Sequence, residues 1–225
     1  MKCNRQTVVH LDKKTNTVRL RASSVGPIDE RTPADRLLEA TIDAIDAGGE
    51  SAVRVQDIAD VAGVQIPILY RKFGNREQLI QAAQIERLGR ALDREFREFR
   101  AVVDQATTAA QFQSLLDLIL ASLDTVERRA ARWQRVNVIG STYGRPELAA
   151  AVSQLQSRTI RGIADALRRP QLQGWLRNDL DLEAFAAWFA GQIMGRIVIE
   201  LGDSEIDQSA WNSISADAVR HVLLG

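Results

Sequence analysis

Apolar residues recur every three or four positions along most of the 225-residue chain, as they do on the buried face of a helix. The clearest runs are "LLEATIDAI" (37–45), "LGRALDREF" (88–96) and "FQSLLDLILASL" (112–123). About nine helices are expected between residues 33 and 224, and no convincing core strand interrupts them. The pattern therefore predicts an all-α fold.

Capping and breaking residues indicate where the helices begin and end. Thr32 is expected to cap the first helix, with Pro33 in its first turn, and the "GG" at 48–49 ends it. Asn75 is expected to cap a long helix that starts with "REQL". "RRPQLQGW" (168–175) predicts a helix break, whereas "LEAFAAWFAGQIMGRIVIEL" (182–201) predicts one helix that is almost wholly apolar.

The N-terminal residues have a different character from the rest of the chain. Up to Gly26 they hold six Lys or Arg residues and only one acid, Asp12, so this arm is basic. Alternation around "KKTN" is compatible with a weak hairpin over residues 7–22. Disorder, or order only with a partner, is the other interpretation, because an isolated hairpin is marginally stable in water.

Composition indicates a soluble globular protein, with 45% hydrophobic and 26% charged residues. Lys plus Arg and Asp plus Glu both number 29, so any attraction to nucleic acid has to come from local clustering. The single cysteine, Cys3, excludes an intrachain disulfide and suits a reducing compartment. The N-terminal residues lack the apolar segment of a signal peptide, and Gln192 and Arg196 interrupt the longest apolar run. We therefore expect a cytoplasmic protein with no membrane partner.

The stretch "DIADVAGVQIPILYRKFGNREQLI" (57–80) interrupts the helical pattern twice within a few residues. A short helix at about 54–62, the turn "GVQ" and a second short helix at about 66–72 have helix-turn-helix proportions. Gly63 is suited to the left-handed conformation that ends the first helix, and Ala59 is small where the two helices meet. Pro67 fits the first turn of the second helix.

These residues carry a family resemblance. Residues 36–80, and above all "DIADVAGV…LYRKFGNREQL", resemble the DNA-binding domain of the tetracycline repressor (TetR) family. The resemblance implies a homodimer that places two recognition helices in successive major grooves of a double-stranded DNA operator, and a small-molecule effector in the second domain that moves them apart. It divides the chain into a basic arm and linker (1–32), a helix-turn-helix domain (33–80) and a helical ligand-binding and dimerisation domain (81–225).

Candidate DNA contacts lie on the second short helix and the residues that flank it. The helix geometry presents Ile66, Ile68 and Arg71 outward, and the resemblance adds a phosphate contact for Arg76 at the start of the next helix. The full set is Arg54, Gln56, Gln65, Ile66, Pro67, Ile68, Tyr70, Arg71, Lys72 and Arg76.

Two features argue against strong DNA reading. The isoleucines depart from the small polar residues usual in the family, and an isoleucine can only pack on a thymine methyl. The two isoleucines therefore either face A·T base pairs in the operator or belong to the local core. Residues 34–80 also hold five basic against eight acidic residues, although four of the five basic residues lie in or next to the motif. The basic N-terminal arm is a further candidate for phosphate or minor-groove contacts.

In the second domain, aromatic and polar residues are candidates for an effector pocket, although core packing and ordinary hydrogen bonding are alternatives. The candidates are Trp133, Asn137, Ser141, Tyr143 and Trp188. A stripe of small residues on the apolar helix, formed by Ala187, Gly191 and Gly195, predicts the dimer contact, with burial inside one chain as the alternative. The closed form of such a dimer is a four-helix bundle with residues 210–224.

Catalytic and metal chemistry are not indicated. His10 and His221 are far apart in sequence, "GSTYG" lacks the spacing of a nucleophile elbow, and no cofactor motif is present. The sequence therefore predicts a ligand-responsive transcriptional regulator, most simply a repressor. The alternative is a TetR-fold dimer that binds a small molecule or protein and has a degenerate reading head. An all-α enzyme is a third hypothesis with no residue to nominate.

Overall fold

The structure is a computed structural model that describes the backbone of residues 7–11 and 18–22 and the whole of residues 31–202 and 205–225. From residue 31 onward the described chain is helical, which confirms the all-α prediction. The helical elements are α1 (Pro33–Gly48), the 3-10 turn η1 (Glu50–Ala52), α2 (Val55–Ala62), α3 (Ile66–Phe73), α4 (Arg76–Gln105), α5 (Ala109–Ser122), α6 (Val126–Ser141), α7 (Pro146–Leu172), α8 (Leu182–Gly195), α9 (Ile197–Glu200) and α10 (Gln208–Leu224).

The N-terminal arm contains a two-stranded hairpin. Strand β1 (Thr7–Leu11) pairs with β2 (Val18–Ala22) in antiparallel register, with Thr7 opposite Ala22 and Leu11 opposite Val18. Of the two interpretations of this arm, the structure therefore has the hairpin. The basic residues at 2, 5, 13 and 14 lie outside the described residues.

The helix starts follow the capping signals. The Thr32 hydroxyl accepts a hydrogen bond from the Asp35 backbone N–H, and the Asp35 carboxylate accepts one in return from the Thr32 backbone N–H, which completes a capping box. The Asn75 side chain accepts from the Gln78 N–H at 2.8 Å and caps α4. Local side chains thus fix the beginnings of α1 and α4, as predicted.

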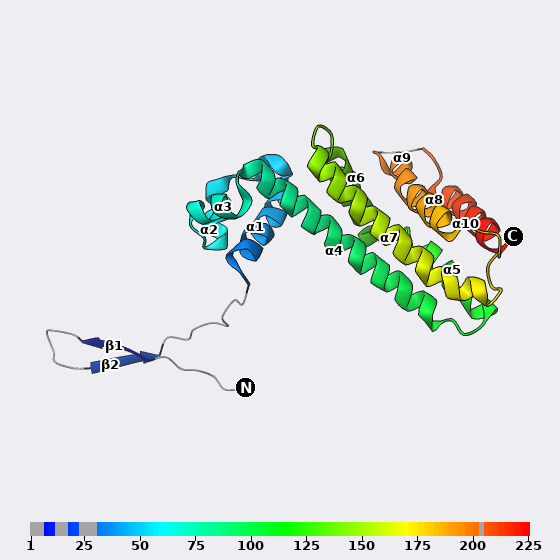
Figure 1. Ribbon diagram of the computed structural model, residues 1–225, viewed down its shortest axis with the longest axis horizontal. Coiled ribbons are helices and arrows are strands. Elements are labelled where there is room, and N and C mark those ends of the chain that lie inside the picture. Colours follow the sequence, from blue (N-terminus) through cyan, green and yellow to red (C-terminus); the bar gives the residue numbers. More distant parts are fainter. Residues whose placement is uncertain (1–6, 12–17, 23–30, 203–204) are drawn as a thin grey trace.

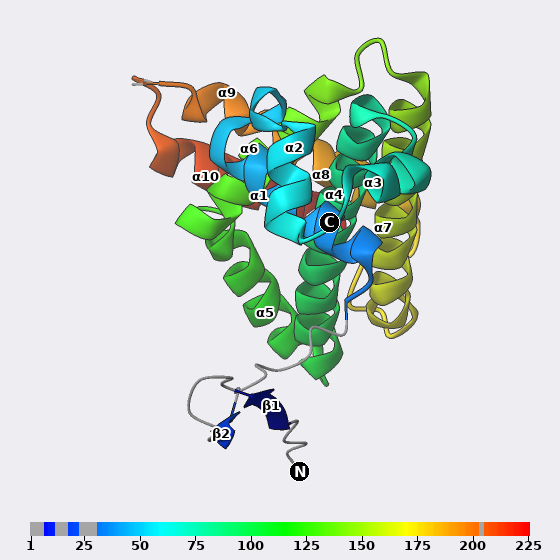
Figure 2. The ribbon, with the colours of Figure 1, turned by 90° about the vertical axis from the view of Figure 1, so that its left-hand side faces the viewer.

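Helix α4 organises the molecule. It has 30 residues and is therefore about 45 Å long. Helices α1–α3 gather around its first turns, while α7 lies beside its remaining length and α5, α6, α8 and α10 complete a second group (Figures 1 and 2). We call α1–α3 with the first two turns of α4 the head, and the rest of α4 with α5–α10 the body.

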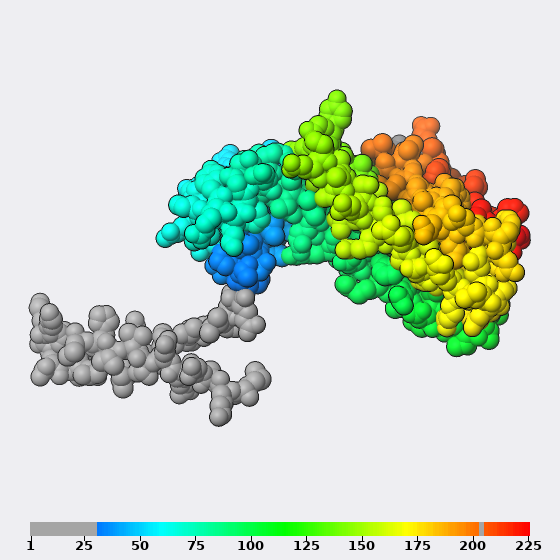
Figure 3. Space-filling view, viewed as in Figure 1, coloured from blue at the N-terminus to red at the C-terminus, as the bar shows by residue number. Residues whose placement is uncertain are grey.

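Head and body have separate apolar cores, although α4 passes between them without a break. The head core is built from α1, α2, α3 and the start of α4, and it includes the fully buried Leu37, Leu69 and Leu79. The main body core is built from α4, α5, α7, α8 and α10, and it includes Phe112, Phe185 and Leu223. Figure 3 shows the head at one end of the molecule and the loop between α6 and α7 rising beside it.

Of two predicted helix boundaries, one is confirmed and one is wrong. The break predicted within residues 168–175 is confirmed, because α7 ends at Leu172, although Pro170 itself lies inside the last turn of the helix. A proline so close to the C-terminus removes only one ladder hydrogen bond, and burial of its ring compensates. The long apolar helix is divided at Arg196 into α8 and α9, so that about nine predicted helices become ten in the described chain. Gly195 weakens the helix there, and the Arg196 side chain is held by groups from other elements.

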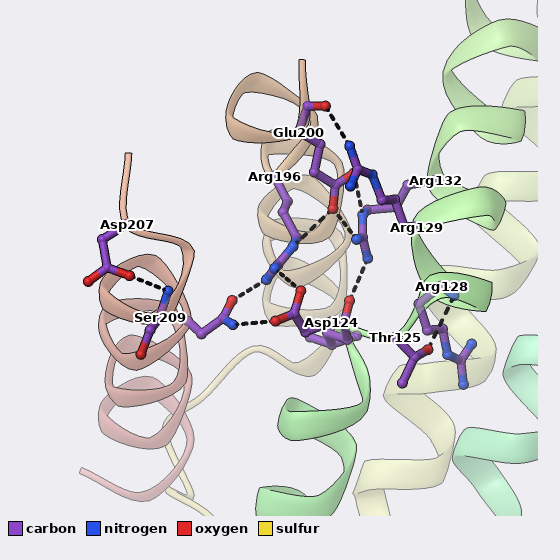
Figure 4. Close-up of polar contacts among 11 residues, drawn as sticks. Asp124, Thr125, Arg128, Arg129, Arg132, Arg196, Glu200, Asp207 and Ser209 are labelled. Atoms are coloured by element: carbon purple, nitrogen blue, oxygen red, sulfur yellow. Dashed lines mark hydrogen bonds and ion pairs between the residues drawn. The ribbon is translucent and has the colours of Figure 1, made fainter. Parts of the chain in front are cut away.

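The groups that hold Arg196 form a buried ionic cluster between α6, α9 and α10 (Figure 4). Glu200 accepts hydrogen bonds from both Arg132 and Arg196, and the exposed fractions of these three residues are 2%, 3% and 5%. Arg196 also contacts Asp124 and Asn212, and Arg129 donates to the Glu200 carbonyl at 2.9 Å. Buried charges are tolerated only when they are paired and hydrogen-bonded in this way, so the cluster fixes how α9 meets α6.

Candidate functional site

Helices α2 and α3 form the helix-turn-helix that the sequence predicts. Gly63 ends α2 in the left-handed conformation, with φ 61° and ψ 39°. The Val64 N–H then donates to the Ala59 carbonyl at 2.9 Å, and Ala59 is buried where the two helices meet. Pro67 lies in the first turn of α3, as expected. The turn is therefore fixed by backbone geometry that only glycine adopts without strain.

One side of α3 packs on the head and the other faces solvent. Leu69 is fully buried in the head core. Polar and basic residues at the start and end of α3 are exposed, and Tyr70 is an exposed aromatic residue beside them. The exposed candidates on and around α3 are Arg54, Gln56, Gln65, Pro67, Tyr70, Arg71 and Lys72.

The two isoleucines of α3 differ from their neighbours. Ile66 and Ile68 are both half-buried, and Ile68 packs against the head core. Ile68 is thus partly a core residue, which agrees with the alternative that the sequence left open. Ile66 lines a shallow hollow together with Gln56 and Gln65, where the turn between α2 and α3 meets the surface.

Arg76 has a different immediate role from the one that the resemblance implied. Its Nε donates to the Val53 carbonyl at 2.7 Å, and its Nη2 donates to the Glu50 carbonyl at 2.5 Å. These bonds tie the start of α4 to the segment that leads into α2, so the guanidinium positions the helix-turn-helix. Its contact with a phosphate stays a prediction.

The head meets the body at Arg145, in the loop between α6 and α7. Its guanidinium donates two hydrogen bonds to Glu50 of η1, at 3.0 and 2.8 Å, and forms an ion pair with Glu77 of α4 at 2.7 Å. The buried Gln84 of α4 also donates to Glu50, at 2.9 Å. Burial alone would raise the pKa of Glu50, but the hydrogen bonds from Arg145 and Gln84 hold the pKa below its ordinary value.

The body contains a large cavity of about 670 Å³, within the usual range of small-molecule sites. Five helices line it, and most of the lining is apolar. Along α4 the lining runs from Leu92 to Gln105, which corresponds to about 20 Å of helix. Phe99, Leu115 and Ile163 are among the apolar residues that line it.

Charged residues also line the cavity, on the side where α4 and α6 face each other. Arg128 forms an ion pair with Glu98 at 2.8 Å, and Arg135 forms one with Glu95 at 2.6 Å. All four side chains line the cavity. The cavity therefore combines a mostly apolar lining with two ion pairs on its α4–α6 side.

None of the predicted effector residues lines this cavity, and their contact with an effector stays a prediction. The cavity is lined instead by other faces of α4 to α8. Tyr143 lies in the α6–α7 loop and is 95% exposed, and Trp133 is 38% exposed. Trp188 packs in the body core, with its ring 5.9 Å from that of Phe185. The remaining two candidates, Asn137 and Ser141, bond to each other within the last turn of α6, where the Ser141 hydroxyl donates to the Asn137 carbonyl.

The residues that do line the cavity left only a partial signal in the sequence. Phe96 and Phe99 follow the helical spacing of an inward face, and both line the cavity. Periodicity marks such residues as inward, but it does not separate a packed core from a hollow one, because the volume depends on how five helices are placed.

The small residues predicted to form the dimer contact lie along one side of α8. Ala187 and Gly191 are exposed and line the rim of the cavity, and Gly195 is half-buried at the end of the helix. A Cβ atom added at Gly191 or Gly195 would meet no atom within 4 Å. The stripe is thus open on the single chain.

The segment Leu182–Glu200, which contains this stripe, is long and apolar enough to cross a membrane, and 33% of it is buried inside the chain. Length and composition alone support such a span only weakly. Its last turns carry Arg196 and Glu200 in the buried ionic cluster, which ties them to α6 and α10.

Comparison with known proteins relates both the head and the overall fold to one group of bacterial regulators. Residues 37–83 match the family described as "Bacterial regulatory proteins, tetR family". The chain is 31% identical over 106 residues to the HTH-type transcriptional repressor KstR2 of Mycolicibacterium smegmatis, which covers 47% of this chain and 49% of that protein. It is 26% identical over 147 residues to KstR2 of Mycobacterium tuberculosis H37Rv, which covers 65% and 70%.

The fold also resembles that of solved structures. A TetR-family transcriptional regulator from a Rhodococcus species superposes with a TM-score of 0.60 at 25% identity, over 85% of this chain and 98% of that one. The matched segment spans about half the length of the first KstR2 relative, so the family likeness rests most firmly on the head. The chain is therefore similar to TetR-family bacterial transcriptional regulators: its head matches the family model, and its helix-turn-helix and helical body follow the same fold.

Proposed function

We propose that this protein is a cytoplasmic, ligand-responsive transcriptional repressor that binds a palindromic DNA operator as a homodimer. The observation that carries the proposal is the exposed face of α3 on a helix-turn-helix whose turn and core match the sequence signature of the family. The relatives named above are transcriptional repressors, which supports repression over activation.

The proposed DNA contacts come from the exposed polar residues of the head. Gln65 and Tyr70 would contact bases or sugars in the major groove, and Lys72 would contact a phosphate. Arg54 and Gln56 would contact the backbone from the start of α2. Since Ile68 packs on the head core, only Ile66 is left to meet a thymine methyl. The head holds more acidic than basic residues. Arg71 and Lys72 nevertheless place positive charge on the exposed end of α3, where DNA would lie.

The proposed dimer forms through α8 and α10. Ala184, Ala187 and Gly191 are exposed along α8, and the large apolar side chains of Val198 and Ile214 are 66% and 71% exposed on α9 and α10. An apolar surface of this kind on a single chain marks an interaction site. A second copy related by a two-fold axis would cover it and would set the separation of the two heads.

The proposed effector site is the body cavity, and the α6–α7 loop is the proposed route to the head. Helices α6 and α7 both line the cavity, and they meet at Arg145, whose guanidinium contacts Glu50 and Glu77 at the base of the head. A ligand that fits the cavity best when α6 is displaced would shift the population toward dimers with mis-spaced heads.

The direct test is a mobility-shift assay of the full chain on the DNA that flanks its own gene. We expect binding that Tyr70→Ala weakens about tenfold, the loss of one good contact. Circular dichroism would show that the variant keeps its helical content. Equal binding by the variant would contradict the assignment of α3 as the reading helix, and the absence of binding by wild type would favour a degenerate head.

A further inference from the structure

The two ion pairs in the cavity lining indicate which chemical class of effector it takes. This step rests on the proposed function only in treating the cavity as the effector site. Both arginines there are already paired, Arg128 with Glu98 and Arg135 with Glu95, so a ligand with a charged head has to exchange with one member of a pair. The member that leaves more easily decides the sign of charge that the site accepts.

In each pair the glutamate is the more exposed member. The Arg128 side chain is 27% exposed and that of Glu98 is 52% exposed, while the values for Arg135 and Glu95 are 12% and 23%. Glu98 can therefore move into water at little cost, because exposed ion pairs contribute little to stability. Leaving an arginine without its partner at the cavity wall would cost more free energy, because an unpaired charge away from water is costly.

This asymmetry favours anions over cations. An incoming carboxylate takes the place of the Glu98 carboxylate on Arg128, keeps the guanidinium paired, and leaves Glu98 to solvent. An incoming ammonium would have to pair with a glutamate and leave the less exposed guanidinium without a partner. Carboxylates also match the planar donor face of arginine in a bidentate geometry.

The rest of the cavity lining indicates the shape and polarity of the remainder of the effector. Most of the remaining lining is apolar and includes Phe99 and Val102 of α4, Leu115 of α5 and Ile163 of α7. A second, smaller void of about 20 Å³ lies behind Phe99, Leu115 and Ile163, which line both spaces. An elongated apolar body placed there would be removed from water over most of its length.

We infer that the effector is an elongated amphipathic carboxylate, whose carboxylate pairs with Arg128 on the α4–α6 side of the cavity and whose apolar body packs against the apolar lining supplied by α4, α5 and α7. Most of the affinity comes from the apolar body, and the head group supplies the selectivity. Arg135, which is more buried and keeps Glu95, forms the wall behind the carboxylate.

The test uses the full chain without DNA and three probes that share one tail: dodecanoate, dodecanol and dodecyltrimethylammonium, each below its micellar concentration. Titration calorimetry should find dodecanoate binding about tenfold tighter than the alcohol, as expected for one charge-assisted contact, and the ammonium binding most weakly. Acetate, which has the head group without the tail, should not bind measurably.

Three variants sharpen the result. Arg128→Gln should remove the preference for dodecanoate over dodecanol and leave the alcohol unaffected. Glu98→Gln should strengthen dodecanoate binding, because it removes the competing carboxylate. Arg158→Gln is the matched control, since Arg158 loses the same charge on α7 but its exposed ion pair with Asp93 lies outside the cavity lining.

The inference is overturned if none of the three tailed probes binds, if the alcohol or the ammonium binds as tightly as the carboxylate, or if Glu98→Gln weakens carboxylate binding. Its failure can be distinguished from failure of the proposed function. A protein that prefers dodecanoate but binds no DNA contradicts the regulator alone, and one that binds DNA but shows no head-group preference contradicts this inference alone.

Discussion

The head and the body of this protein are both helical, but they are held together in different ways. The head is a small apolar core with a turn fixed by one glycine, and its proposed DNA contacts lie on the outside of α3. The body is built around a cavity of about 670 Å³ and contains a buried ionic cluster centred on Glu200. One region presents a surface, and the other encloses a space.

This difference shows where stability and function compete in the molecule. The head can pack tightly because its proposed function needs only an exposed face, so core residues and proposed contact residues are separate. The body has to leave space unfilled where five helices meet, and a cavity forgoes the packing that a filled core would give. The ionic cluster fixes the positions of α6, α9 and α10 relative to one another.

The largest effect should come from the ionic cluster. Glu200→Ala leaves Arg132 and Arg196 buried without their shared carboxylate, and we expect a loss of about 3–5 kcal/mol in the free energy of unfolding. Asp93→Ala, which breaks an exposed ion pair with Arg158 in the same region, should cost no more than about 1 kcal/mol. Denaturant titration measures both, and equal losses would show that the cluster is not a structural centre of the body.

The next largest effect should come from side-chain packing, because truncating a buried side chain should cost more stability in the head than at the cavity wall of the body. Leu69→Ala removes a fully buried side chain from the head core and should cost about 2–5 kcal/mol. Leu115→Ala removes a half-buried side chain from the cavity wall and should cost about 1 kcal/mol, because much of its surface already faces open space. Similar losses at the two sites would mean that the cavity is filled or collapsed in solution.

The junction between the regions should respond to acid. Because the pKa of Glu50 is lowered in the folded protein, its contribution is complete at pH values above its ordinary pKa and is lost as the pH falls through the lower, folded value. We expect Glu50→Gln to reduce stability by about 1.5 kcal/mol near neutral pH, as for a hydrogen bond to a charged group, with the difference from wild type shrinking in strong acid. A difference that grows in acid would contradict this sign.

One glycine in each region tests the backbone conformation there. Gly63→Ala places a side chain on a left-handed residue in the head and should cost about 1 kcal/mol. Gly140→Ala adds a methyl group in α6, where no atom lies within 4 Å, and should stabilise the body by about 0.5–1 kcal/mol. Thermal unfolding would show opposite shifts, and a shift of the same sign would contradict the assigned role of the turn.

The smallest effect on stability should come from the surface of α3. Lys72→Ala should leave the unfolding free energy almost unchanged, but it should reduce the salt dependence of DNA affinity by about one unit of log–log slope, as for one lost phosphate contact. Arg158→Ala on the body should leave the slope as it is. An unchanged slope in the Lys72 variant would remove that residue from the proposed interface.

The two regions also differ in how far they could be predicted from sequence. In the head, Gly63, Ala59 and Pro67 act on their immediate neighbours, so the turn and its helices were predicted almost to the residue. Capping by Thr32 and Asn75 is local for the same reason. The bonds from Arg76 to backbone carbonyls were not foreseen, because they depend on how a distant segment folds back.

In the body the decisive features arise between elements. The cavity depends on the placement of five helices, and sequence spacing favoured Trp133 and Tyr143, which are exposed, over Phe99 and Arg128, which line the cavity. Glu200 and Arg132 are far apart in sequence, so their pairing had no local signal. The break at Arg196 follows from the same pairing rather than from helix propensity alone.

The central claim is that two copies of the head read DNA together. The most direct measurement is a footprint of the full-length protein on the DNA that flanks its own gene. We predict two protected half-sites on one face of the duplex, related by two-fold symmetry and separated by about 34–36 Å or a multiple of it, the repeat of successive major grooves. A single protected stretch without symmetry, or no protection at low salt, would contradict the claim.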